Sequence, residues 1–229
     1  MRKFLISLLA VADNAAPLQE DAKTAAVVQG IDTTAKLTDK DVACFLKNGF
    51  RAGIFRIGNE GAVDKVGVEN ARKSHAAGFK YELYIAPNPF SPAGPQFISA
   101  YNYARTEQLV PQRVWLQVTS PMFWDRNTTN NARFITDFIQ AVKRYKIRAG
   151  LYTNWYDYEQ ITGNSKEIPN VDVDIWYWHV NSPGPGGEQS PEHSDYRQFG
   201  PFSGPAAIKQ FAIRMKTCDV DNNWISIRP

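Results

Sequence analysis

The sequence predicts an α/β protein, an irregular TIM-like βα barrel. Short apolar strands alternate with amphipathic helices over the first two-thirds of the chain, the pattern of parallel βαβ units. A length of 229 residues suits one such barrel. In the last third, strands follow one another with few helices between them. We therefore expect regular βα units at first and an irregular closure of the barrel afterwards.

Capping residues and apolar periodicity indicate the elements in turn. Thr38 starts a helix with N-cap chemistry, and Gly49 follows its end. A Pro-rich surface loop covers 88–95, and residues 171–178 alternate between apolar and other side chains. The predicted strands are 27–32, 52–57, 81–86, 114–118, 149–153, 171–178, 206–213 and 222–227, and the predicted helices are 38–48, 66–77, 97–108, 129–145 and 156–161.

Charge and motif content exclude several classes of function. The formal net charge of +3 is too small to indicate nucleic-acid binding, although it favours adsorption to anionic surfaces such as bacterial walls. His75, His179 and His193 are scattered and lack metal-ligand spacing. The chain has no phosphate loop, dinucleotide fingerprint or nucleophile elbow. We expect no cofactor and no metal.

The N-terminus resembles a signal peptide over residues 1–16. Arg2-Lys3 precede a short apolar run, and small residues near positions 12 and 16 offer two cleavage points. The run is too short to span a membrane. The alternative is a buried N-terminal segment. We expect a secreted or extracellular protein, or one in the lumen of the secretory or lysosomal route, with a single domain over 26–229, no membrane association and a monomeric state.

Two further features fit a secretory route. Cys44 and Cys218 would form one disulfide in an oxidising compartment, and two buried thiols are the alternative. Asn127 opens an Asn-Thr-Thr sequon, a candidate glycosylation site that also occurs by chance.

In a βα barrel, the functional site lies at the C-terminal ends of the strands. That rule selects six side chains, while Asp172 and Asp174 fall at the opposite end of their strand. Aromatic side chains at strand ends either stack on sugar faces or pack in the core, and both alternatives stay open for Trp115, Trp155 and Trp176. The six selected residues are Asp32, Arg56, Tyr84, Thr119, Asn154 and Trp178.

Several segments in a fixed order resemble glycoside hydrolase family 25, the muramidases that cleave peptidoglycan, and most of all its nematode lysozyme-like branch. The opening Gly30-Ile31-Asp32 is similar to the family's Gly-Ile/Val-Asp strand. The other matching segments are 44–50, 55–57, 76–78 with Tyr84, 150–154, 175–178, 208–211 and 220–223. The resemblance implies a secreted protein of antibacterial defence, with bacterial peptidoglycan or a related glycan as its partner.

The strand over 114–118 departs from the family pattern. Active members carry Asp-x-Glu at its end, and the matching positions here are Gln117 and Thr119. Glycoside hydrolysis needs one group that holds a transferable proton and another that stabilises positive charge on the sugar. Neither an amide nor a threonine hydroxyl supplies such a proton, although both can hydrogen-bond a sugar. The departure predicts impaired catalysis.

Three hypotheses follow from this comparison. In the first, the protein binds glycan in an inherited groove without efficient catalysis. In the second, it remains an active muramidase that uses other carboxylates, Asp32 with Glu82 in particular; the alternative for this pair is one retained family acid and one polar barrel-interior group. In the third, the barrel has no glycan role. Further groups near strand ends or in matching motifs are Asp125, Asp157 and Asp221.

Overall fold

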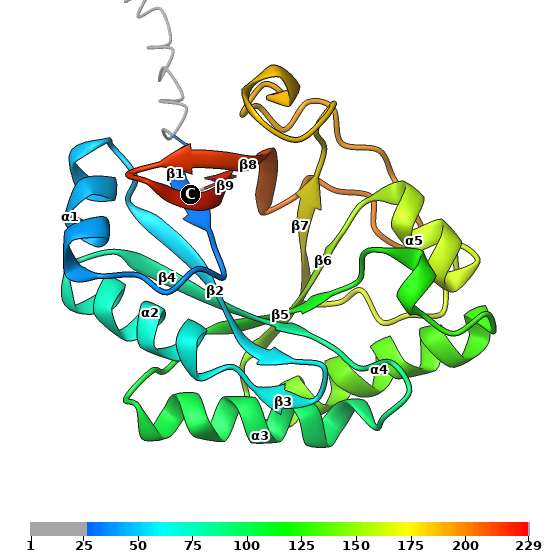
Figure 1. Cartoon of the computed structure of the whole chain (residues 1–229). Helices are drawn as coiled ribbons and strands as arrows, with labels where there is room; N and C mark the ends of the chain where they lie inside the picture. Colours follow the sequence, from blue (N-terminus) through cyan, green and yellow to red (C-terminus); the bar gives the residue numbers. More distant parts are fainter. Residues whose placement is uncertain (1–26, 229) are drawn as a thin grey trace, which may run out of the picture.

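A computed structural model describes residues 27–228 and confirms the predicted α/β barrel (Figure 1). Its strands form one sheet in the order β1-β9-β8-β7-β6-β5-β4-β2-β3, and a parallel pairing of β1 with β2 closes the ring. β3 pairs only with β2 and lies outside that ring. The strands are β1 (Val28–Asp32), β2 (Ala52–Asn59), β3 (Ala62–Val63), β4 (Lys80–Ala86), β5 (Arg113–Gln117), β6 (Arg148–Thr153), β7 (Val173–Trp178), β8 (Ile208–Thr217) and β9 (Val220–Ile227).

The helices surround the barrel on every side of the view except the top (Figure 1). They follow the first strands in turn, and the β8–β9 hairpin occupies the side that lacks them (Figure 1). Within residues 27–228, no helix combines the length and the apolar character that a membrane crossing requires. The helices are α1 (Asp39–Lys47), α2 (Lys65–Ala76), α3 (Ala93–Thr106), α4 (Thr128–Arg144) and α5 (Trp155–Thr162), with short 3₁₀ turns η1 (Pro121–Phe123) and η2 (Pro185–Gly187).

The closure is irregular, as predicted, because β9 runs antiparallel to both of its neighbours, β1 and β8. A two-residue turn joins β8 to β9. Both of its residues, Cys218 and Asp219, have positive φ angles of 58° and 61°. This is the backbone geometry of the tight hairpin turns that match the natural twist of two strands. The barrel is therefore sealed by a hairpin rather than by a last βα unit.

Several predicted boundaries were wrong. β7 begins at Val173, because Asp172 has a positive φ of 55° and Val171 is 70% exposed. The alternation before Val173 was therefore a turn and not a strand. α3 begins at Ala93, inside the predicted loop, since Pro95 needs no N–H donor in the first helical turn. The closing strands are longer than predicted, and β3 was not predicted at all.

The barrel interior is filled by side chains in layers, and β5 shows their order. Its inward-pointing residues alternate along the strand: Arg113 binds carboxylates at the N-terminal end, Trp115 is fully buried in the middle, and Gln117 reaches the C-terminal opening. The middle layer is apolar and consists of Ile54, Tyr84, Trp115, Trp176, Ile208 and Ile225. This layer separates the ionic groups at the N-terminal end from the polar groups at the opening.

One glycine is required by the middle layer. A Cβ atom on Gly150 of β6 would lie 2.1 Å from the ring of Trp115, so no larger residue fits opposite the indole. Trp115 is held further by a stacked guanidinium of Arg113, 4.3 Å from the ring centre. The packing leaves Trp115 as a core residue, and it does not reach the opening.

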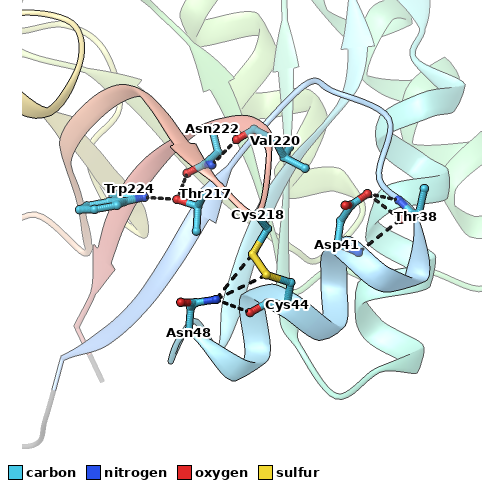
Figure 2. Close-up of a disulfide and its surroundings, with 9 residues drawn as sticks. All are labelled: Thr38, Asp41, Cys44, Asn48, Thr217, Cys218, Val220, Asn222 and Trp224. Atoms are coloured by element: carbon cyan, nitrogen blue, oxygen red, sulfur yellow. Dashed lines mark hydrogen bonds between the residues drawn. A yellow bond between two sulfur atoms is a disulfide. The ribbon is translucent and has the colours of Figure 1, made fainter.

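A disulfide joins Cys44 of α1 to Cys218 of the β8–β9 turn, across 174 positions of sequence. Figure 2 shows the two sulfurs beside Asn48, whose side chain donates a 2.9 Å hydrogen bond to the carbonyl of Cys44. The bridge ties the first helix to the hairpin that closes the barrel. The disulfide lies beside the place where the first strand, β1, pairs with the last strand, β9, and so reinforces this closure of the barrel.

The long connection between β7 and β8 is anchored by one buried lysine. Lys209 of β8 is 2% exposed and donates hydrogen bonds of 2.8 Å to the carbonyls of Ser190 and Glu192 and to the carboxylate of Asp195. Asp195 also pairs with His179, which follows the last residue of β7. The ionic contacts hold this connection against the C-terminal ends of the strands.

Candidate functional site

A cleft of about 400 Å³ lies at the C-terminal ends of the strands, where the fold class places functional sites. We call it the strand-end cleft. Its sides come from the ends of β5, β6 and β7, from a bulged part of β8, and from β9 and the first turn of α5. Its lining residues are Gln117, Thr119, Ser120, Tyr152, Asp157, Trp178, Gln210, Ile213, Arg214 and Asn223.

Gln117 and Thr119 both line the cleft, as predicted from their places at the end of β5. The side-chain amide of Gln117 donates a 2.9 Å hydrogen bond to the hydroxyl of Thr119. The two residues therefore present an amide and a hydroxyl as a connected pair. At these positions the cleft offers hydrogen bonds to a ligand and no acidic proton.

Asp32 lies behind the cleft wall at the end of β1. Its side chain is buried, and one carboxylate oxygen accepts hydrogen bonds from Gln210 at 3.1 Å and from Asn223 at 2.8 Å. The other oxygen has no partner among the described residues. Burial raises the pKa of Asp32 to about 6, against the lowering effect of the two amides and of the Arg56 charge.

A chain of hydrogen bonds connects Asp32 to the cleft. The hydroxyl of Tyr152 donates to the side-chain oxygen of Gln210 at 2.6 Å, and the amide of Gln210 donates to Asp32. Burial raises the pKa of Tyr152 well above its ordinary value, and the negative charges of Asp32 and Asp157 raise it further. Tyr152 therefore remains a neutral donor.

Asp157 is the carboxyl group that lines the cleft itself. It lies in the first turn of α5, which Asn154 caps by accepting a 2.8 Å hydrogen bond from the backbone N–H of Asp157. The residue is buried, and its Oδ2 accepts a 3.0 Å hydrogen bond from the indole of Trp178. Burial raises the pKa of Asp157 to about 6, while the hydrogen bonds from Trp178 and the backbone of Ser120 lower it.

Glu82 does not join Asp32 in the structure. Its carboxylate binds the guanidinium of Arg113 at 2.7 Å and the indole of Trp115 at 3.0 Å, below the apolar layer. Asp174 binds the same arginine at 2.7 Å. Glu82 and Asp32 share no hydrogen-bond partner among residues 27–228. The geometry assigns Glu82 to the ionic network at the N-terminal end of the barrel, as a polar group of the barrel interior.

The remaining predicted residues divide between the cleft and its supports. Trp178 lines the cleft. Tyr84 packs edge-on against Trp176 in the apolar layer, and Arg56 pairs with Asp64 at 2.8 Å. Asn154 caps α5, with its amide 3.4 Å from the carbonyl of Trp178. These three support the site but are absent from the cleft wall.

Two predicted positions lie on the surface. Asp221 is exposed; it pairs with Lys216 in the β8–β9 hairpin, and its backbone carbonyl accepts a 2.7 Å hydrogen bond from the hydroxyl of Thr33. Asn127 is exposed and caps α4 through its side-chain oxygen, which accepts from the backbone N–H groups of Thr129 and Asn130. The amide nitrogen of Asn127, the atom that glycosylation modifies, is not used in the cap.

Seven residues that line the cleft are absent from the predicted site, Ser120 and Ile213 among them. Gln210 and Asn223 lie within the matching segments 208–211 and 220–223, so that signal was present. Tyr152 belongs to the segment 150–154. Asp157 was predicted only as a further acid near a strand end. Arg214 had no signal, because it enters the wall through a bulge in β8 where its φ is 53°.

The arrangement combines neutral hydrogen-bonding groups with two carboxyl groups whose pKa values lie near 6. Trp178 adds an aromatic surface, and Arg214 adds a cationic group. Among the described residues, no group of three or more His, Cys, Asp or Glu side chains is arranged to hold a metal ion. Such a cleft suits a polar, uncharged or weakly anionic ligand.

Comparison with known proteins identifies the family. A family model described as Lysozyme-like protein 1 matches residues 23–211. Lysozyme-like protein 2 of Caenorhabditis elegans is 40% identical over 173 residues, which cover 75% of this chain and 61% of that protein. Lysozyme-like protein 1 of the same organism is 36% identical over 205 residues, covering 87% of this chain and 68% of that protein. The chain thus spans about three-fifths of the length of the first of these relatives.

The fold agrees with solved structures. The family GH25 lysozyme from Aspergillus fumigatus superimposes with a TM-score of 0.67 at 14% identity, covering 89% of this chain and 95% of that chain. This likeness concerns the fold alone, and the nematode sequences carry the assignment. Together they confirm the resemblance found in the sequence. The chain belongs to the lysozyme-like proteins of glycoside hydrolase family 25, in the branch that includes the nematode members.

Proposed function

We propose that the protein acts on bacterial peptidoglycan chiefly as a binder, with its strand-end cleft as the glycan site and with impaired catalysis. The observation that carries this proposal is the Gln117–Thr119 pair, hydrogen-bonded at 2.9 Å in the wall of the cleft. The amide of Gln117 and the hydroxyl of Thr119 can both donate and accept hydrogen bonds, so a sugar in the cleft finds partners for its hydroxyl groups. The resemblance implies that active members of the family use carboxyl groups at these two positions for acid catalysis.

The impairment has an expected size. General acid catalysis contributes roughly 10²- to 10⁴-fold to a rate. Loss of the proton donor therefore reduces turnover strongly without removing hydrogen bonds that hold the substrate. Binding and catalysis separate in this way because hydroxyl and amide groups bind sugars, whereas only an acid protonates the leaving oxygen.

Apolar side chains beside the cleft support a polymeric ligand. Met122 and Phe123 of η1 are 83% and 67% exposed, and η1 follows the cleft residue Ser120 directly. Tyr156 of α5 is 50% exposed and immediately precedes Asp157. Exposed aromatic groups next to a polar cleft offer stacking surfaces for further sugar units. A glycan chain that extends past the cleft would contact them.

We further propose that the protein is secreted and serves in antibacterial defence. The disulfide between Cys44 and Cys218 supports an oxidising compartment, in which such bonds persist. The predicted signal peptide, which lies outside the described residues, points the same way. Expression of the chain with its own N-terminus in animal cells tests secretion: the protein should accumulate in the medium. Retention in the cytosol would contradict the proposal.

Sedimentation with insoluble peptidoglycan tests the binding function. The protein should pellet with the cell-wall polymer, and Gln117→Leu should weaken pelleting because leucine cannot donate or accept a hydrogen bond. Gln140→Leu, an exposed position on α4, is the matched control and should pellet like the wild type. Absence of pelleting by the wild type would contradict the proposed function.

A further inference from the structure

The strand-end cleft contains one carboxyl group that occupies neither of the family's usual acid positions. Asp157 comes from the first turn of α5, whereas Gln117 and Thr119 come from the end of β5. All three line the same cleft of about 400 Å³. A ligand in that cleft is therefore in reach of a carboxyl group from a different wall.

The side chain of Asp157 is held in a defined orientation. It is 3% exposed as a whole residue, and Oδ2 accepts the indole N–H of Trp178 at 3.0 Å. The helix cap by Asn154 holds the backbone of Asp157. Such positioning is what general acid catalysis requires, because proton transfer depends on geometry before acidity.

From this placement we propose that Asp157 is the proton donor for slow hydrolysis of the glycan bound in the cleft, in place of the missing acid at the end of β5. The inference rests on the proposed glycan-binding function. It assigns to the chain a catalytic residue on α5, outside the strand that carries the family's acids.

The step balances as an ordinary hydrolysis. Asp157 transfers its proton to the bridging oxygen while the bond from that oxygen to the sugar C1 breaks, and the leaving sugar departs as an alcohol. Water adds at C1 and loses a proton to solvent, and solvent restores the proton on Asp157. One glycosidic bond and one water are consumed, and two hydroxyl groups form.

Neighbouring groups define the electrostatic setting of Asp157. Tyr152 of β6 and Arg214 of β8 are the other ionisable side chains in the cleft wall, and Asp32 of β1 lies behind Gln210. β5, β7 and β9 contribute Gln117, Thr119, Trp178 and Asn223 to that wall, none of which titrates as an acid or a base near neutral pH. Since burial keeps Asp157 protonated up to about pH 6, turnover should be present below that pH and should fall above it.

The test measures reducing ends released from peptidoglycan between pH 4 and pH 8, with sedimentation measured in parallel. Asp157→Asn keeps an acceptor for Trp178 but has no acidic proton. It should lower turnover by roughly 10²- to 10⁴-fold while binding stays within about twofold. Glu159→Gln, an exposed position on the same helix, should leave both unchanged.

A further variant tests whether the activity lost in Asp157→Asn is due to misfolding. Adding Gln117→Asp and Thr119→Glu to Asp157→Asn places acids at the end of β5, and turnover should return without Asp157. Wild-type binding with no turnover, or equal turnover by wild type and Asp157→Asn, would overturn the role of Asp157 and leave the binding function intact. Absence of wild-type binding would overturn both.

Discussion

The indole N–H of Trp178, at the end of β7, donates a 3.0 Å hydrogen bond to Oδ2 of Asp157 in α5. This contact joins the end of a barrel strand to the helix that follows the preceding strand. It stabilises the charged form of the carboxyl group, and thereby opposes the effect of burial. The acidity of Asp157 therefore depends on this aromatic neighbour, together with the backbone of Ser120.

Trp178→Phe should raise the pKa of Asp157 further above its ordinary value, beyond about 6, because the donor is lost while the burial remains. Titration of carboxyl carbons by NMR measures the change. Trp155→Phe is the control, since Trp155 contacts Arg197 and donates no described hydrogen bond to Asp157. A pKa for Asp157 that stays the same or falls in Trp178→Phe would contradict the assignment.

Asp32 should make stability depend on pH. Its pKa is raised from 3.8 to about 6 in the folded protein, so the native state holds the proton more tightly than the unfolded chain does. Its stabilising contribution is complete below pH 4 and is lost as the pH rises through 6. Relative to wild type, Asp32→Asn should therefore gain up to roughly 3 kcal/mol of unfolding free energy between pH 4 and pH 7. Asp137→Asn, which is exposed, should show no such trend in urea titrations.

Arg113 should be essential for stability at the N-terminal end of the barrel. It binds both Glu82 and Asp174, and its side chain is only 14% exposed. Arg113→Met leaves two carboxylates without their shared partner and should cost about 3–5 kcal/mol of unfolding free energy. Arg148→Met is the control, because Arg148 is 56% exposed and should cost less than about 1 kcal/mol. Similar losses in both variants would contradict this account.

The disulfide should contribute much of the stability of the barrel closure. Replacing Cys44 and Cys218 together by serine frees a loop of 174 positions and should destabilise the protein by up to about 5 kcal/mol. Thermal unfolding followed by circular dichroism measures the effect. Reduction of the wild type should lower its midpoint similarly, and a reductant should not change the midpoint of the double variant. An unchanged midpoint in the double variant would show that the hairpin closes the barrel without the bridge.

Arg214 should favour peptidoglycan over a neutral glycan. It is the cationic group in the cleft wall, and the peptide stems of peptidoglycan carry free carboxyl groups that chitin lacks. Arg214→Gln should weaken binding to peptidoglycan by up to about fivefold, as expected for an exposed ion pair, and should leave binding to chitin unchanged. Arg144→Gln, on the exposed end of α4, removes the same charge elsewhere and controls for net charge. Equal weakening on both polymers would contradict the role of Arg214.

Local patterns in the sequence were sufficient for most elements and failed where the chain turns. The helix from Thr128 to Arg144 was predicted within a residue at each end, because its apolar side chains recur at helical spacing. β7 was extended backwards to Val171, since alternation alone does not show that Asp172 has a positive φ. α3 was shortened because the prolines before it suggested a loop.

The sequence by itself determined the βα order and the family resemblance, and it placed Gln117 and Thr119 at the end of a strand, since these depend on residue type and spacing. Only the tertiary structure decided which carboxyl groups meet. Glu82 and Tyr84 are two positions apart on β4, so both side chains face the barrel interior. They nevertheless lie in different layers. The Trp115 layer then separates Glu82 from Asp32. Asp157 reaches the cleft because it lies in the first turn of α5, directly after the end of β6. Its burial and its hydrogen bond from Trp178 of β7 depend on the packing of distant segments, which no local pattern encodes.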